Sequence, residues 1–179
     1  GAGKITAEWM MNGEMYEDIF SLDISRFEKF HSELDFITER VTETLGNLYA
    51  MHWPFKQHTT SRNQKLMPYH DHLIKKGACF GQAAAYERPM WYAIKGNEPK
   101  YKYSYGHQNW YESAQYETLN ARTNVALFEL SPFAKFELAG LNSHSSLQYL
   151  CANNIKNKAG AITYTQMLNS KGGIESDLT

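Results

Sequence analysis

A hairpin signal near the end of the sequence constrains the fold more than any other feature. Two strand-like runs, residues 161–168 and 173–178, flank a turn-forming segment at residues 169–172 that reads Asn-Ser-Lys-Gly. A symmetric loop over this segment places Tyr164 directly across from Asp177. The chain is therefore expected to contain an antiparallel strand pair with a phenol and a carboxylate on one face.

The predicted pair of Tyr164 and Asp177 has two interpretations. A phenol ring offers a flat surface for a heteroaromatic ligand, and a carboxylate accepts hydrogen bonds from the N–H groups of that ligand. Alternatively, the pair is a cross-strand surface contact without function, and a register slip of one residue would place the two side chains on opposite faces. The spacing alone leaves both interpretations open.

Helical periodicity recurs between the turn-forming residues. The clearest amphipathic helix is predicted over residues 32–45, with Ser32 as its N-cap and Gly46 as the residue that ends it. Shorter helices are predicted at residues 5–12, 69–76, 110–122 and 142–151.

Two further segments bear on the domain organisation. Residues 133–138 follow a period of two and are predicted to form a strand. Residues 87–105 concentrate turn-forming residues and polar tyrosines, which predicts a linker between two domains. Helices and strands that follow one another in this order indicate an α+β fold class.

Composition excludes several classes of partner. Eighteen Lys and Arg residues against nineteen Asp and Glu residues give a net charge of -1, which disfavours nucleic acid and anionic membranes. No apolar run approaches the roughly 18 residues of a membrane span. The hydrophobic fraction of 42% supports a globular domain, and Cys79 and Cys151 lie in no C-x-x-C pair, which fits a reducing compartment.

Two motifs suggest sites that the local geometry does not support. His70-Asp71-His72 contains metal-ligating residue types, but residues two apart on a helix point to different sides, so no metal site is predicted. Gly1 and Gly3 resemble part of a phosphate-binding turn, but the sequence lacks the complete G-x-G-x-x-G motif and its preceding strand. Structural roles are expected for both motifs.

Separate blocks of the sequence resemble, in the correct order, one family of flavoenzymes. Residues 1–10 and 23–27 resemble the end of the flavin domain in the FAD-dependent dimethylglycine and sarcosine dehydrogenase family. The blocks that resemble the central connector of this family are residues 49–55, 61–62, 69–73, 77–81 and 86–91.

The second half of the sequence resembles the start of an aminomethyltransferase domain of the glycine cleavage T-protein kind. Residues 125–136 and 151–154 carry part of this resemblance. Its most specific part is Tyr164-Thr165-Gln166-Met167-Leu168-Asn169, continued by Gly172-Gly173-Ile174-Glu175-Ser176-Asp177-Leu178-Thr179.

The resemblance implies three parts in the chain. Residues 1–24 would be the C-terminal end of an FAD-dependent oxidoreductase domain, and residues 25–95 would be its central connector domain. Residues 96–179 would be the N-terminal part of the T-protein-like folate-binding domain. The sequence starts without Met and stops directly after a strand-like run, so an internal fragment of a longer protein is expected.

The resemblance also implies a chemistry. FAD takes a hydride equivalent from an N-methyl group of sarcosine or dimethylglycine, and tetrahydrofolate captures the one-carbon unit. Tyr164 and Asp177 would bind tetrahydrofolate, and Asp177 would also be the catalytic residue near its reacting nitrogens. Glu175 is expected on the same face as Asp177, without an assigned role. Most flavin contacts would come from other parts of the protein, so the chain alone would be inactive.

Partners, location and alternative functions follow from the same resemblance. The implied partners are an N-methylated glycine substrate, tetrahydrofolate and an electron acceptor that is either oxygen or a protein. The implied location is the cytoplasm for a bacterial protein and the mitochondrial matrix for a eukaryotic one. One alternative is a non-redox regulatory protein, because the regulatory subunit of pyruvate dehydrogenase phosphatase is similar over this region. A partial gene product without function is a third interpretation.

Overall fold

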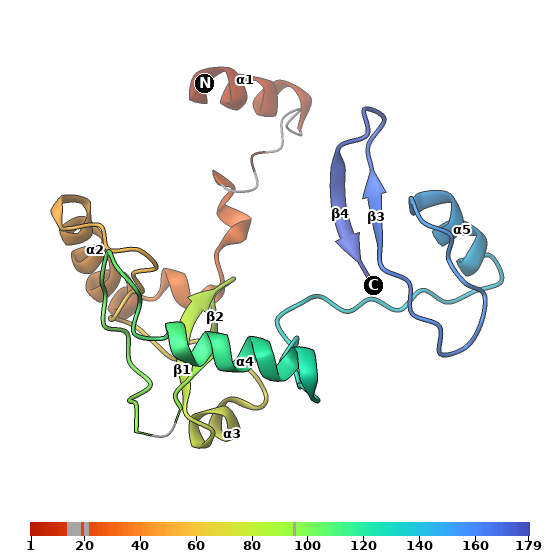
Figure 1. Cartoon of the computed structure of the whole chain (residues 1–179). Helices are drawn as coiled ribbons and strands as arrows, with labels where there is room; N and C mark the ends of the chain where they lie inside the picture. The colour runs from red at the N-terminus through yellow and green to blue at the C-terminus, as the bar shows by residue number, and fades with distance from the viewer. Residues whose placement is uncertain (14–18, 20–21, 95) are drawn as a thin grey trace. The chain divides into compact units, whose positions relative to one another are not determined.

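The computed structural model describes residues 1–13, 19, 22–94 and 96–179. The chain divides into unit 1, Gly1–Phe133, and unit 2, Ala134–Thr179 (Figure 1). Each unit combines helices with a two-stranded antiparallel sheet. This mixture confirms the predicted α+β fold class.

Irregular segments separate the helices and strands of unit 1. In chain order the elements are α1 (Ala2–Asn12), η2 (Ile24–Arg26), η3 (Lys29–Ser32), α2 (Leu34–Tyr49), α3 (His70–Lys75), β1 (Ala78–Ala83), β2 (Tyr86–Tyr92) and α4 (Tyr111–Thr123), where η marks a 3-10 helix. Gly13 follows α1 in a left-handed conformation with φ of 75°, so the helix ends at Asn12, where the predicted helix over residues 5–12 also ends. Across the described parts of both units, no helix is long and apolar enough to cross a membrane.

The β1–β2 hairpin holds the small core of unit 1. Its strands pair antiparallel, with a register shift after Cys79. Helix α3 packs on β1, and α4 packs on β2 (Figure 1). The most buried apolar side chains of the unit lie in or beside this hairpin: Met67, Leu73, Ala78, Cys79 and Trp91. Because this apolar core is small, polar contacts carry much of the remaining structure.

A buried ion pair joins Arg62 to β2. The side chain of Glu87 is fully buried, and its two oxygens accept hydrogen bonds from Nε of Arg62, at 2.7 Å, and from Nη2. The backbone N–H of Asn63 donates to the same carboxylate, and Arg62 also donates to the carbonyls of His58 and Phe80. Burial raises the pKa of Glu87, but the hydrogen bonds from Arg62 and Asn63 outweigh it and hold that pKa below its usual value.

The polar face of helix α2 attaches it to unit 1. Glu39, Arg40 and Glu43 form hydrogen bonds with the backbone and hydroxyl groups of residues 59–61. The opposite face carries apolar side chains that are 40% to 77% exposed: Leu34, Ile37, Val41, Leu45 and Leu48. The predicted amphipathic helix is confirmed, but the described residues leave its apolar stripe in solvent.

The predicted ends of α2 are wrong. The N-cap residue is Glu33 rather than Ser32, because Ser32 belongs to the preceding 3-10 helix. Gly46 lies inside α2 and does not end it. A glycine costs only about 1 kcal/mol within a helix. A hydrogen bond of 2.7 Å from Lys56 to the side chain of Asn47 holds the turn that follows.

Two predictions about extended segments are also wrong. Residues 87–105 are not a continuous linker, because Tyr86–Tyr92 forms β2. Pro89 is tolerated in this strand because a two-stranded sheet leaves one edge of each strand without ladder hydrogen bonds. The strand predicted at residues 133–138 does not form, because none of the described strands pairs with this segment.

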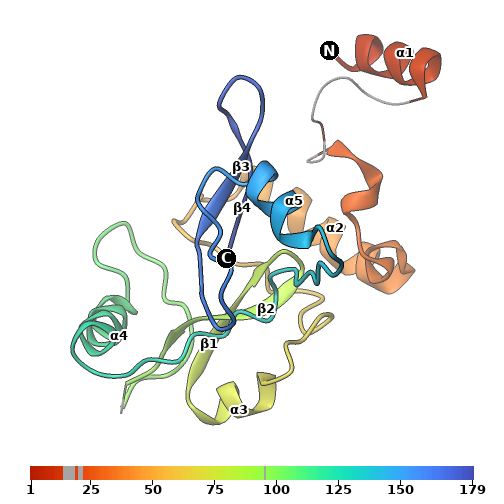
Figure 2. The ribbon, with the colours of Figure 1, turned by 90° about the vertical axis from the view of Figure 1, so that its right-hand side faces the viewer.

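Unit 2 consists of α5 (Ser143–Leu150), β3 (Thr165–Leu168) and β4 (Ile174–Leu178). Helix α5 lies on the β3 side of the hairpin in Figure 1, and Figure 2 shows the same elements turned by 90°. Cys151, directly after α5, forms a β-bridge with Met167. Thr165 is 1% exposed, and its hydroxyl accepts a hydrogen bond of 3.0 Å from the backbone N–H of Asn153. One face of the hairpin is thereby anchored to the segment after α5.

Replacing Glu87 with Gln tests the importance of the buried ion pair. The substitution leaves the charge of Arg62 without its partner, and breaking a buried pair costs about 3 kcal/mol or more. We expect Glu87→Gln to lower the free energy of unfolding by about 3 kcal/mol in chemical denaturation followed by tryptophan fluorescence. Glu98→Gln is the control, because its pair with Lys100 lies on the surface and should contribute less than about 0.5 kcal/mol. Equal effects of the two substitutions would contradict this account.

The attachment of α2 should depend on pH through Glu43. Burial raises the pKa of Glu43, but hydrogen bonds from Thr60 and Thr59 outweigh it and lower the pKa from 4.5 to about 2. The ionised carboxylate therefore stabilises this contact above pH 4.5, and the stabilisation is lost as the pH falls towards 2. A ¹³C NMR titration of the Glu43 carboxylate should show the low midpoint, and Thr60→Val should raise it. A midpoint of 4 or above in the unchanged protein would refute the assignment.

Candidate functional site

Asn169 organises the loop of the β3–β4 hairpin. Its Oδ1 accepts hydrogen bonds from the backbone N–H groups of Lys171 and Gly173, at 3.0 and 2.9 Å. Gly172 has a φ of 80°, a left-handed conformation that favours glycine. The backbone of Asn169 also bonds to Gly172 and Gly173. The hairpin predicted at this place is confirmed.

The register of the two strands differs from the predicted register. Gln166, rather than Tyr164, lies directly across from Asp177. Two features cause the difference: a β-bulge after Met167, and a loop that also includes Gly173. Each feature shifts the pairing by one residue, so the pairing is displaced by two in total.

A displacement of two residues keeps Tyr164 and Asp177 together. Side chains on a strand alternate between faces with a period of two, so Tyr164 and Gln166 share a face. The hydroxyl of Tyr164 donates a hydrogen bond of 3.2 Å to Oδ2 of Asp177. The structure thus brings together the two site residues predicted from the sequence, diagonally rather than directly across the ladder.

The face that carries Tyr164 and Asp177 is open. Tyr164 is 58% exposed, and Asp177 is exposed as well. Glu175 is the extra residue of the β-bulge, between Ile174 and Ser176, so the face predicted for it stays a prediction; its Oε1 accepts a hydrogen bond of 2.7 Å from the side-chain amide of Asn169. The other face, with Thr165, is anchored, so the hairpin presents these polar groups from a held backbone.

This arrangement suits a flat ligand that carries N–H groups. The ring of Tyr164 offers a stacking surface, and its hydroxyl orients the Asp177 carboxylate. Within the described part of the chain, Oδ1 of Asp177 accepts no hydrogen bond. An ionised carboxylate with an available oxygen accepts hydrogen bonds from a ligand and stabilises positive charge on it.

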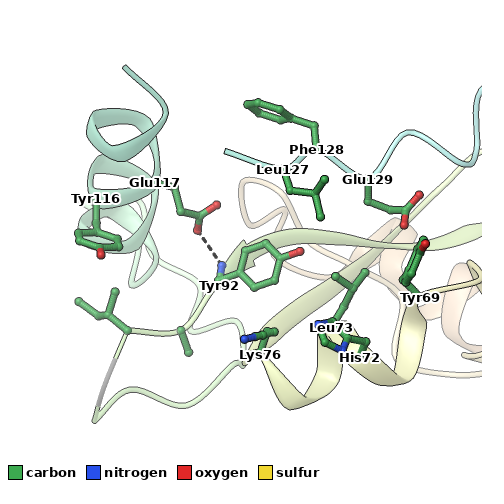
Figure 3. A pocket seen from close by; sticks show the side chains of 12 residues that line it. Tyr69, His72, Leu73, Lys76, Tyr92, Tyr116, Glu117, Leu127, Phe128 and Glu129 are labelled. Atoms are coloured by element: carbon green, nitrogen blue, oxygen red, sulfur yellow. Dashed lines mark hydrogen bonds between the residues drawn. The ribbon is translucent and has the colours of Figure 1, made fainter. Parts of the chain in front are cut away.

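A second candidate site is a cavity of about 970 Å³ in unit 1 (Figure 3). Its lining comes from α3, the end of β2, α4 and the segment that follows α4: Tyr69, His72, Leu73, Lys76, Tyr92, Ala93, Ile94, Tyr116, Glu117, Leu127, Phe128 and Glu129. The Glu117 carboxylate accepts a hydrogen bond of 2.8 Å from the backbone N–H of Tyr92, which Figure 3 draws. Burial, followed by the charges of Glu117 and Glu129, raises the pKa of Tyr92. The lining is mainly aromatic and aliphatic, which suits packing more than acid–base chemistry.

The histidines of the His70-Asp71-His72 motif do not converge. His70 is buried with its ring 4.4 Å from that of Phe80, whereas His72 lines the cavity. Of the residues whose positions are described, no three His, Cys, Asp or Glu side chains cluster closely enough to hold a metal ion. Burial raises the pKa of Cys79 to about 11, so this cysteine is a thiol at neutral pH rather than a nucleophilic thiolate.

Two family models match the chain. The model described as the GCVT N-terminal domain matches residues 69–179, which is more than half of the chain. The chain belongs to the GCVT N-terminal domain family. The model described as the FAD dependent oxidoreductase central domain matches residues 12–66. This order of domains is the one that the sequence resemblance implies, whereas the boundaries predicted at residues 24 and 95 stay predictions.

Curated relatives of this GCVT N-terminal domain protein align along almost its entire length. It is 41% identical to 4-methylaminobutanoate oxidase (formaldehyde-forming) of Paenarthrobacter nicotinovorans, over 100% of this chain and 22% of that protein. It is 30% identical to mitochondrial sarcosine dehydrogenase of Homo sapiens, again over 100% and 22%. It is 31% identical to the mitochondrial pyruvate dehydrogenase phosphatase regulatory subunit of Mus musculus, over 99% and 21%. The chain therefore spans about a fifth of the length of these relatives, and they confirm the resemblance to the sarcosine and dimethylglycine dehydrogenase family.

Gln166 is the residue of the open face that sequence reasoning missed. The assumption of a symmetric loop over residues 169–172 placed Tyr164 in its position opposite Asp177. The adjacent glycines Gly172 and Gly173 were the available signal, because two consecutive glycines allow a longer loop. The bulge after Met167 has no comparable mark in the sequence.

Replacing Asn169 tests how the loop supports the open face. Asn169→Ala removes the acceptor for two backbone N–H groups and the donor to Glu175. We expect hydrogen exchange at Gly173 and along both strands to accelerate about tenfold, because lost turn hydrogen bonds destabilise the hairpin by about 1–2 kcal/mol. Ser170→Ala, in the same loop, is the matched control and should leave exchange unchanged. Unchanged exchange in Asn169→Ala would show that the strands alone hold the register.

Proposed function

We propose that this chain is part of an FAD-dependent oxidoreductase that demethylates an N-methylated amino acid and passes the one-carbon unit to tetrahydrofolate. The observation that carries the proposal is the hydrogen-bonded pair of Tyr164 and Asp177 on the open hairpin face, inside the matched GCVT N-terminal domain. The names of two relatives, an oxidase and a dehydrogenase of methylated amino compounds, support the reaction class.

The flavin half of the reaction is not assigned to residues of this chain. FAD, when bound, accepts a hydride equivalent from the N-methyl group of the substrate. The sequence has no complete glycine-rich dinucleotide turn, and most contacts with that cofactor are proposed to come from other parts of the protein. The proposed contribution of this chain is the capture of the one-carbon unit.

In the capture step, Asp177 and Tyr164 position the folate. Oxidation of the substrate leaves an iminium, and an amine of tetrahydrofolate attacks its carbon. The attacking amine would lose a proton as the first C–N bond forms, and the nitrogen of the departing amino acid would take up a proton and leave with the electron pair of the old bond. The second folate amine would then form the other C–N bond of methylene-tetrahydrofolate and release a proton. The ionised carboxylate of Asp177 accepts a hydrogen bond from the attacking amine and stabilises its positive charge, while the ring of Tyr164 supports the pterin.

The proposed substrate is an N-methyl amine that also carries a carboxylate. Sarcosine stands in the name of one relative, and 4-methylaminobutanoate stands in the name of another. The second name includes the formation of formaldehyde, which is the product when water rather than folate captures the iminium. The two fates of the one-carbon unit are distinguished by measuring formaldehyde and methylene-tetrahydrofolate separately.

The complete protein that contains this sequence is the material for the test. Its flavin spectrum is recorded anaerobically with sarcosine, dimethylglycine or 4-methylaminobutanoate, with and without tetrahydrofolate. We expect one of these amines to bleach the flavin and methylene-tetrahydrofolate to form. Asp177→Asn should lower the yield of methylene-tetrahydrofolate at least tenfold, because a neutral amide does not stabilise the cationic amine. Ser176→Ala, on the other face of the same strand, is the matched control and should retain both half-reactions.

Three outcomes would contradict parts of the proposal. A flavin that none of the three amines reduces would refute the oxidoreductase function and would favour a role like that of the regulatory relative, which is 31% identical. Flavin reduction with formaldehyde as the sole one-carbon product would refute transfer to folate. Full transfer by Asp177→Asn would refute the role of this carboxylate.

The proposal extends to the electron acceptor and the location. The acceptor is oxygen or an electron-transfer protein, which stopped-flow reoxidation of the reduced flavin distinguishes. The location is the cytoplasm if the protein is bacterial and the mitochondrial matrix if it is eukaryotic. The mitochondrial relatives from animals and the bacterial oxidase support these two locations.

A further inference from the structure

Gln166 occupies the central position of the open hairpin face. It lies directly across the ladder from Asp177 and two residues after Tyr164, which precedes β3 and is hydrogen-bonded to Asp177, so the three side chains share a face. Its backbone is fixed, because its carbonyl accepts a hydrogen bond of 2.8 Å from the N–H of Ala152. The neighbouring Thr165 is buried on the opposite face. The backbone at Gln166 is therefore fixed by its contacts with the segment that follows α5.

The side chain of Gln166 has unused hydrogen-bonding capacity. It is half-buried, yet among the described residues its amide group forms no hydrogen bond. A primary amide carries both a donor and an acceptor, whereas an ionised carboxylate such as Asp177 only accepts. Tyr164 already donates its hydroxyl hydrogen to Asp177. Gln166 is thus the one group of this trio that can still donate a hydrogen bond to a ligand.

We propose that Gln166 determines the specificity of the hairpin for a pterin with a carbonyl group at position 4. This inference rests on the proposed binding of tetrahydrofolate. The ring amide of that pterin presents a carbonyl oxygen beside an N–H, and a primary amide pairs with both at once. Asp177 and Tyr164 have no free donor for the carbonyl oxygen. Recognition of that oxygen therefore falls to Gln166.

Charge substitution at Gln166 should change which pterin is preferred. In the Gln166→Glu variant the ionised carboxylate has no hydrogen to donate, so it would repel the 4-carbonyl oxygen and accept hydrogen bonds from a 4-amino group. A site built to pair with one pattern of donors and acceptors rejects the opposite pattern. Gln166→Met keeps the length of the side chain and removes both hydrogen bonds, so it should weaken binding without creating the new preference.

The test measures dissociation constants of the complete protein for tetrahydrofolate and for its 4-amino analogue. We expect Gln166→Met to weaken tetrahydrofolate binding about fivefold to tenfold, as the loss of one or two neutral hydrogen bonds does. We expect Gln166→Glu to change the ratio of the two constants at least tenfold in favour of the 4-amino analogue. Ser170→Glu adds the same charge in the exposed loop, away from Asp177, and should leave the ratio unchanged.

The outcomes separate this inference from the proposed function. If the unchanged protein binds tetrahydrofolate and Asp177→Asn weakens that binding, but neither Gln166 variant alters affinity or preference, the inference fails while the folate site stands. If Ser170→Glu shifts the ratio as much as Gln166→Glu, general electrostatics explains the change and the inference fails. If the unchanged protein binds neither pterin, the folate site fails and this inference fails with it.

Discussion

Glu87 places a carboxylate in a part of unit 1 that water does not reach, and Arg62 makes that placement tolerable. The same guanidinium also bonds to the carbonyls of His58 and Phe80, so the irregular segment around residue 60 is tied to the β1–β2 hairpin. That segment is in turn the surface to which Glu39 and Glu43 attach helix α2. The position of α2 in unit 1 therefore depends indirectly on the buried ion pair of Arg62 and Glu87.

Unit 1 uses polar contacts where most domains use apolar ones. The carboxylates of helix α2 and Arg40 form hydrogen bonds with residues 59–61, while the side chains of Leu34, Val41 and Leu45 remain exposed. Hydrogen bonds depend on geometry more strictly than apolar packing does. A unit held in this way keeps a defined arrangement with a small core, and its stability depends on pH through carboxylates such as Glu43.

The sequence allowed prediction of element types more reliably than of element limits and pairing. Helical periodicity located α2, but Gly46 did not end it, because a glycine costs only about 1 kcal/mol inside a helix. The alternation of apolar and polar residues at 133–138 was not enough to predict a strand, because a strand needs a pairing partner that composition does not reveal. Tyr164 and Asp177 are neighbours, as predicted, although the predicted register of the strands was wrong. The wrong register is also the reason why Gln166 was missed.

The numbers of residues in the loop and in the bulge of the β3–β4 hairpin together determine which side chains lie on its open face. Compared with a symmetric four-residue loop and no bulge, each feature shifts the pairing by one residue. Because side chains alternate with a period of two, the total shift of two leaves the same side chains on the open face. A single insertion or deletion between Leu168 and Ile174, without a compensating change, would turn Asp177 towards the anchored face and Ser176 towards the open face. Related hairpins that keep a tyrosine and an aspartate on one face should therefore differ in length by even numbers of residues, so loop length is inherited as part of the binding chemistry.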